Sequence, residues 1–140
     1  MIDYQKATDI ANCEDVTSRP DSVVLYSISY LKSNANKIAA LEYVAAHPSA
    51  TMIDQTPCGK KLIELGLDAA DLSNEDKMLA TEIWKIASRR FIQSAKGNIT
   101  AFVNNADPRS VFRSLELPEI LKNPDIKTVN GVDKTKFRAW

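Results

Sequence analysis

The chain is poor in the residues that most often mark catalytic or metal-binding sites. It has one histidine, two cysteines and four glycines, and its 18 basic residues balance 18 acidic ones. One histidine and two distant cysteines are too few for a zinc site, and two cysteines cannot make a disulfide framework. The balanced charge gives no electrostatic basis for binding nucleic acid or a membrane surface.

Long apolar runs are also missing, since no stretch of the sequence is long enough to cross a bilayer. The N-terminal segment 1–16 lacks the basic-then-apolar order of a signal peptide, so we expect a soluble chain. We expect Cys13 and Cys58 to be free thiols, which suits folding in a reducing cytosol. The 140 residues, 44% apolar and 26% charged, are typical of a globular protein, and we expect residues 1–140 to form one domain.

Apolar periodicity predicts an α/β fold. Short β-branched and aromatic runs predict strands at 23–27, 98–103 and 125–129. Helical patterns cover 2–13, 36–46, 57–65, 74–95 and 108–117. Because strands alternate with helices, we expect a small, mostly parallel sheet flanked by helices, with an N-terminal helical part over one side. The order of the strands is not evident from the pattern.

Capping residues set several of these helix boundaries. Thr56 before Pro57 predicts an N-cap followed by a proline in the first turn. Ser73 and Asp76 have the spacing of a capping box before the longest helix. Asp107 is expected to cap the last helix, and Pro118 to end it near residue 117.

Several short motifs are too weak to predict a site. His47 ends a predicted helix beside Pro48, where it is more often a C-terminal cap than a catalyst. The segment 58–61 (CGKK) lacks the first glycine and the final hydroxyl residue of a phosphate-binding loop. Asn98 begins a glycosylation sequon, which matters only in a secretory protein.

Taken singly, the remaining polar and aromatic residues have ordinary interpretations. Glu116, late in a short helix, would be a solvated surface residue. Trp84 would be part of the core or line a groove, one helical turn before the hydroxyl of Ser88.

Read together, four segments are far more specific. Residues 83–103 (IWKIASRRFIQSAKGNITAFV) hold Trp84 and Ser88, and residues 110–118 (SVFRSLELP) hold Ser110, Phe112 and Glu116. Upstream, the segments are VVLYSISY (23–30), with Tyr26, and TMIDQTPCG (51–59), with Asp54. In order and interval they resemble the active-site segments of the ADP-ribosyl cyclase / NAD glycohydrolase family, from about residue 23 to about 132.

This resemblance implies an enzyme that cleaves the nicotinamide–ribose bond of NAD or NADP. NAD is then the substrate, so neither a cofactor nor a metal is expected. By resemblance, Glu116 is catalytic and Trp84 and Tyr26 position the nicotinamide. Asp54 accepts from the carboxamide, while Ser88 and Ser110, with backbone N–H groups near Phe112, hold the pyrophosphate.

Two residues depart from the family pattern. Tyr26 stands where the family usually has tryptophan, which keeps a ring for stacking. Ile53 stands at an acidic position that biases animal relatives between hydrolysis and cyclisation. The loss of that acid leaves the product open. We expect hydrolysis to ADP-ribose, because destruction of NAD is what a toxin needs, with cyclisation to cyclic ADP-ribose as the alternative.

The chain is short and poor in cysteine, as are bacterial members that form the C-terminal toxin parts of contact-dependent growth inhibition systems. That similarity implies a delivered toxin acting in the cytoplasm of the target cell, and an immunity protein that covers its cleft. Two other readings stay open. One is an ADP-ribosyltransferase toxin, and the other is a non-enzymatic binding module with a groove lined by Trp84.

Overall fold

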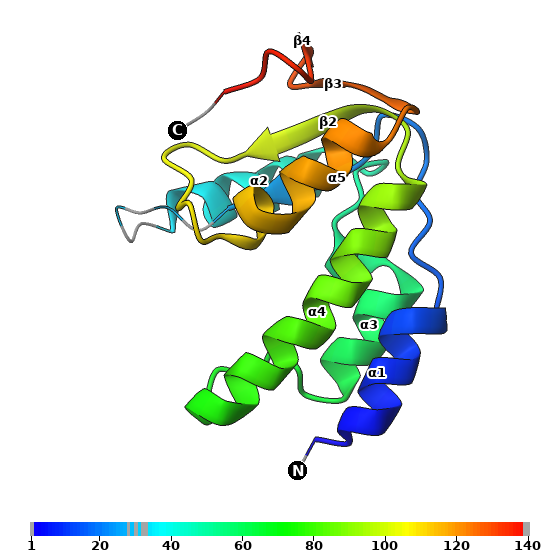
Figure 1. Cartoon of the computed structure of the whole chain (residues 1–140), viewed down its shortest axis with the longest axis vertical. Helices are drawn as coiled ribbons and strands as arrows, with labels where there is room; N and C mark the ends of the chain where they lie inside the picture. Colours follow the sequence, from blue (N-terminus) through cyan, green and yellow to red (C-terminus); the bar gives the residue numbers. More distant parts are fainter. Residues whose placement is uncertain (1, 28, 30, 32–33, 139–140) are drawn as a thin grey trace.

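The molecule has two parts, a small sheet at one end and a group of helices at the other (Figure 1). A computed structural model describes residues 2–27, 29, 31 and 34–138. The long helix α4 (Asn74–Ser94) begins in the helical part and ends at the sheet, so it connects the two. The expected α/β architecture is confirmed.

The sheet has four strands in the order β1-β2-β3-β4. Strands β1 (Val24–Tyr26), β2 (Gly97–Phe102) and β3 (Ile126–Val129) are parallel and match the three predicted strands. Strand β4 (Val132–Asp133) was not predicted and pairs antiparallel with β3. Asn130 and Gly131, both with positive φ, form the two-residue turn between them, so an Asn-Gly hairpin signal was present in the sequence.

The two faces of the sheet bury different side chains, because successive residues of a strand point to opposite faces. The main core lies on the face toward α4, and its strand residues are Val23, Leu25, Ile99, Ala101, Ile126 and Val129. A smaller cluster lies under α2 (Ala35–Ala46), where Val24 of β1 packs with Ala40 and Met52. Tyr26, at the end of β1, packs against this smaller cluster.

The helical part contains α1 (Tyr4–Cys13), α3 (Pro57–Glu64) and the first half of α4. Helix α1 packs against α3 and α4 (Figure 1), so the expectation that it covers one side of the sheet is wrong. The Tyr4 hydroxyl donates to the Asp76 carboxylate and joins α1 to α4. The Asp76 side chain therefore bonds to α1. Only half of the expected capping box is formed, the bond from the Asp76 N–H to the Ser73 hydroxyl.

Other predicted capping residues at the helix ends are confirmed. The Thr56 hydroxyl accepts from the Gly59 N–H at 3.0 Å, and Pro57 opens α3. His47 follows the last residue of α2, and its Nδ1 lies 2.8 Å from the Tyr43 carbonyl oxygen. Both cysteines are free thiols, with Cys13 exposed and Cys58 buried. Within the described ranges, no helix is both long and apolar enough to span a membrane.

The last helix differs most from its prediction. Asp107 accepts from the Arg109 N–H in a turn, and helical structure begins only at residue 111. A π-helical turn, Phe112–Glu116, then continues directly into α5 (Leu117–Lys122). The Leu117 N–H bonds to the Phe112 carbonyl. This wider turn places Pro118 in the first turn of α5, where its missing N–H costs little, so Pro118 does not end the helix.

Asn123, which caps the end of α5, links the end of α4 to the connection between α5 and β3. Its side-chain amide is buried and donates to the carbonyls of Ile92, Gln93 and Ala95 at 2.9, 3.3 and 3.0 Å. The last turn of α4 contains no basic residue, so this amide satisfies carbonyls that the helix itself leaves open.

We expect Asn123→Ala to lower the free energy of unfolding by about 2–3 kcal/mol, because buried carbonyls lose their donor. Urea denaturation measures the change. The matched control is Asn12→Ala, which removes one exposed bond to the Thr8 carbonyl and should change stability by less than about 0.5 kcal/mol. Equal losses in the two variants would contradict the capping role.

Candidate active site

One cavity of about 370 Å³ lies beside the end of β1, between α2, α4 and the π-helical turn. Its walls come from the sheet, from the 3₁₀ turn Ile53–Gln55, from the linker before α4, and from α4 itself. The lining residues are Val24, Leu25, Tyr26, Lys37, Met52, Ile53, Asp54, Asp68, Trp84, Ser88, Val111, Phe112 and Glu116. A position at the carboxyl end of parallel strands is where α/β proteins usually bind ligands.

Glu116 is the most unusual group in this cavity. It is the last residue of the π-helical turn, and only 7% of its surface is exposed. Within the part of the chain that the structure describes, its carboxyl group has no hydrogen-bond donor and no ion-pair partner. A buried carboxyl group without a partner is costly, which makes it a candidate functional group.

Burial has a large effect on this group. Desolvation raises the pKa of Glu116 from 4.5 to about 8, because removal from water penalises the charged form. At neutral pH the empty cavity therefore holds a carboxyl group that is mostly protonated. A cation placed beside it would favour the carboxylate again.

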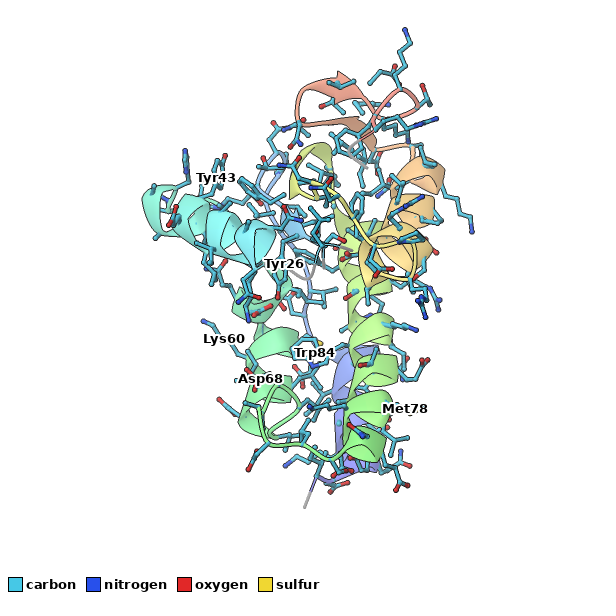
Figure 2. All side chains as sticks on the ribbon, turned by 90° about the vertical axis from the view of Figure 1, so that its left-hand side faces the viewer. Tyr26, Tyr43, Lys60, Asp68, Met78 and Trp84 are labelled. Atoms are coloured by element: carbon cyan, nitrogen blue, oxygen red, sulfur yellow. The ribbon has the colours of Figure 1, made fainter. Side chains whose placement is uncertain are left out.

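Three aromatic rings form much of the wall. Tyr26 comes from the end of β1, Trp84 from α4 and Phe112 from the π-helical turn. In Figure 2, Tyr26 lies above Trp84 and Asp68 lies close to the indole. The indole N–H of Trp84 donates to the Leu67 carbonyl at 3.2 Å, which fixes the plane of the ring.

Tyr26 lies within electrostatic range of two carboxyl groups. Its pKa is raised mainly by desolvation, and further by the negative charges of Asp54 and Glu116. The phenol is therefore neutral and can offer both a ring face and a hydroxyl to a ligand.

Asp54 lies in the 3₁₀ turn and is exposed on its outer side. The packed cavity wall on its inner side raises the pKa of Asp54 through desolvation, and the charge of Asp68 adds to the rise. Lys37 acts in the opposite direction and lowers the pKa of Asp54. The side of the cavity around Asp54 therefore holds two carboxylates and one ammonium group.

The two serines that the sequence indicated lie in different surroundings. Ser88 is buried in α4, lines the cavity, and has no hydrogen-bond partner for its hydroxyl among the described residues. Ser110 does not line the cavity. Its Oγ accepts from the Arg113 N–H at 3.2 Å, and its carbonyl accepts from the Ser114 hydroxyl, so it caps the turn that carries Glu116.

The cavity thus brings together six of the seven indicated residues, namely Tyr26, Asp54, Trp84, Ser88, Phe112 and Glu116. Sequence reasoning missed Lys37 and Asp68 among its charged residues. Lys37 could have been found from its place in the helix after β1, since that end of the sheet usually binds ligands. Asp68 lies in a linker without any pattern, and no signal pointed to it.

Solved structures with the same fold come from ADP-ribosyl cyclases. An ADP-ribosyl cyclase complexed with N1-cIDPR has a TM-score of 0.55 at 16% identity, over 79% of this chain and 48% of that one. Aplysia cyclase with the substrate NGD and the product cGDPR has a TM-score of 0.52 at 15% identity, over 90% and 61%. Porcine CD38 with a covalent intermediate, ribo-F-ribose-5'-phosphate, has a TM-score of 0.52 at 16% identity, over 94% of this chain and 72% of that one.

This chain therefore has the ADP-ribosyl cyclase/CD38 fold. It spans about half the length of the first of these proteins, 48% of that chain. No protein-family model and no curated protein matches its sequence.

The raised pKa of Glu116 makes a prediction about stability. Between the unfolded pKa near 4.5 and the folded pKa near 8, the unfolded chain releases a proton that the folded chain keeps. The free energy of unfolding of the wild type therefore carries a term that falls as pH rises. Glu116→Gln lacks this term, so its stability relative to the wild type should increase by roughly 3 kcal/mol from pH 5 to pH 7.5.

Urea unfolding of both proteins across this pH range measures the difference, in which the titration of all other groups cancels. A difference that does not change with pH would show that Glu116 titrates normally.

Proposed function

We propose that this chain is an NAD glycohydrolase, which cleaves the nicotinamide–ribose bond of NAD or NADP to give nicotinamide and ADP-ribose. The observation that carries the proposal is the buried, unpartnered carboxyl group of Glu116 in a cavity walled by Tyr26 and Trp84. The fold agrees with it, since its solved examples include a cyclase with a dinucleotide substrate and a CD38 with a ribosyl intermediate.

The chemistry of NAD needs few protein groups. Its nicotinamide is a cation attached to C1' of ribose, so it departs as a neutral molecule with the electron pair of the C1'–N bond. The barrier lies in the positive charge that remains on the ribose, as in glycoside hydrolysis. One carboxylate next to C1' stabilises that charge, and this is the role of Glu116.

The raised pKa of Glu116 fits this role in two ways. The pyridinium cation of the bound substrate favours the carboxylate, so binding and ionisation support each other. After nicotinamide has left, water adds to C1' and one of its protons passes to the carboxylate. A carboxyl group with a pKa of about 8 is a stronger base than an ordinary glutamate.

The rings and polar groups orient the substrate. A pyridinium over the face of Trp84 or Tyr26 gains roughly 0.5–2 kcal/mol, and the gain disappears when nicotinamide becomes neutral. Trp84 is well suited, because its bond to the Leu67 carbonyl holds the indole in place. Asp54 accepts from the carboxamide, and the hydroxyl of Ser88 faces the same cavity. Ser110 contributes by capping the turn of Glu116 rather than by holding the pyrophosphate, because it does not line the cavity.

Hydrolysis is favoured over cyclisation because the cavity is open to water at the exposed residue Asp54. Cyclisation would require the adenine of the same molecule to reach C1' before water does, which a closed, dry site favours. Ile53 at the cavity wall leaves the product open in this respect, and hydrolysis suits the toxin role because it destroys NAD.

The biological role that we propose is that of a bacterial toxin domain, delivered into the cytoplasm of a target cell, which it depletes of NAD. The short, cysteine-poor chain with free thiols suits refolding in a reducing cytosol. Such a toxin requires an immunity protein in the producing cell, and we propose that this partner covers the open side of the cavity.

Glu116→Gln should reduce nicotinamide release from NAD by on the order of a thousandfold, because the amide cannot carry the negative charge that stabilises the ribosyl cation. Chromatography of the products measures nicotinamide, ADP-ribose and cyclic ADP-ribose. The control is Glu119→Gln, which changes a glutamate of the same helical segment that pairs with Arg89 outside the cavity. Mostly cyclic product would replace the hydrolase proposal by the cyclase alternative, and equal rates in the two variants would refute the role of Glu116.

The pH dependence of the wild type provides a further test of the same residue. Since the carboxylate is the active form, kcat/KM should rise with pH and level off above about 8, the pKa in the empty cavity. For kcat the rise should come at lower pH, because the bound pyridinium lowers the pKa. A kcat/KM profile that is flat from pH 5 to 9 would contradict the assignment.

Expression in a bacterial cytosol tests the toxin role. Cellular NAD should fall and growth should stop with the wild type, whereas cells producing Glu116→Gln should grow normally. Soluble wild-type protein with unchanged NAD and normal growth would refute the toxin role and leave a binding module as the better interpretation.

A further inference from the structure

Lys37 alone among the described residues of the cavity wall carries a positive charge. The carboxyl groups there are those of Asp54, Asp68 and Glu116. The Lys37 side chain is exposed, and its positive charge acts on Asp54, although none of the described residues forms a direct hydrogen bond or ion pair with it. Its ammonium group is therefore available to a ligand.

The backbone under Lys37 is firmly held. Helix α2 follows β1, so its first turn lies near the carboxyl end of that strand. The buried amide of the preceding residue, Asn36, donates to the Ser27 carbonyl at 3.1 Å and to the Asn104 carbonyl at 2.9 Å. These bonds fix the first turn of α2 to the segments that follow β1 and β2. The backbone of Lys37 is therefore held in a fixed position beside the cavity.

Helix stability does not account for a lysine at this position. Lys37 is the third residue of α2, where the positive end of the helix dipole disfavours a cation. The first turn contains no acidic residue to offset it. At most surface positions a solvated lysine has little effect on stability. Here its positive charge adds to the positive end of the helix dipole at the rim of the cavity.

We propose that Lys37 binds the pyrophosphate of the dinucleotide and so restricts the substrate to phosphorylated pyridinium nucleotides. This inference rests on the proposed function. NAD carries a cation at the nicotinamide and two negative charges at the pyrophosphate. Carboxyl groups around the rings suit the cationic end and repel the phosphates. Among the charged side chains of the described wall, Lys37 is the one that attracts the phosphates, so the pyrophosphate lies beside it.

Lys37 is a positioning residue, since it acts on a part of the substrate remote from C1'. An ammonium is a point charge with three donors, a usual partner for phosphate. Its removal should weaken binding of any ligand with the pyrophosphate and leave the affinity for nicotinamide riboside, which has no phosphate, within about twofold.

The experiment measures dissociation constants by calorimetry, with ADP-ribose and nicotinamide riboside as ligands. Lys37→Met should bind ADP-ribose about tenfold more weakly than the wild type, and Lys37→Arg should restore most of the affinity. The matched control is Lys6→Met, which changes an exposed lysine at the third position of α1 and should have no effect. Equal ADP-ribose affinity in wild type and Lys37→Met, or no binding to either folded protein, would overturn the proposal.

Kinetics with NAD and NADP separate this inference from the function on which it rests. Lys37→Met should raise KM for NAD about tenfold with little change in kcat, and added salt should reduce the difference. A rise confined to NADP would overturn the pyrophosphate assignment and point to the 2'-phosphate. If wild-type protein releases no nicotinamide but binds ADP-ribose through Lys37, the proposed reaction fails and the phosphate subsite stands.

Discussion

The burial of one carboxyl group is the constraint around which this structure is arranged. Glu116 is almost completely removed from water, and the described residues offer it no donor and no cation. The fold stabilises the group in its neutral form, at the expense of the charged form that the proposed chemistry needs. A ligand with positive charge beside the group would favour the ionised form again. This is the property on which the proposed reaction of a pyridinium substrate depends.

The position of Glu116 depends on an irregular helix. A regular α-helix from residue 107 would end at Pro118, as the sequence suggested. The π-helical turn instead places Glu116 at the cavity wall and lets the chain continue through Pro118 into α5. Wider turns of this kind often occur at functional sites. The buried cap of Ser110 and the walls from α4 hold the turn in place.

Helix α4 connects the two parts of the molecule and carries two of the cavity residues. Its first turn is joined to α1 through Tyr4 and Asp76, and its last turn to the connection between α5 and β3 through Asn123. Trp84 and Ser88 lie between these attachments, one turn apart. A ring that must remain in place while a cation forms beside it benefits from such a fixed support. The same cavity also holds the ammonium of Lys37, whose charge acts on Asp54.

The sequence by itself determined the local features of this protein. Three strands, four of the five helices and the caps at Thr56 and Ser73 follow from side-chain pattern and backbone chemistry, which act over a few residues. The intervals among Trp84, Ser88, Phe112 and Glu116 were visible for the same reason. Only the tertiary structure decided that α1 packs on helices and that the helical segment continues through Pro118. It also decided that Lys37 and Asp68 line the cavity. The raised pKa of Glu116 is equally a tertiary property, because desolvation depends on walls brought from distant parts of the chain.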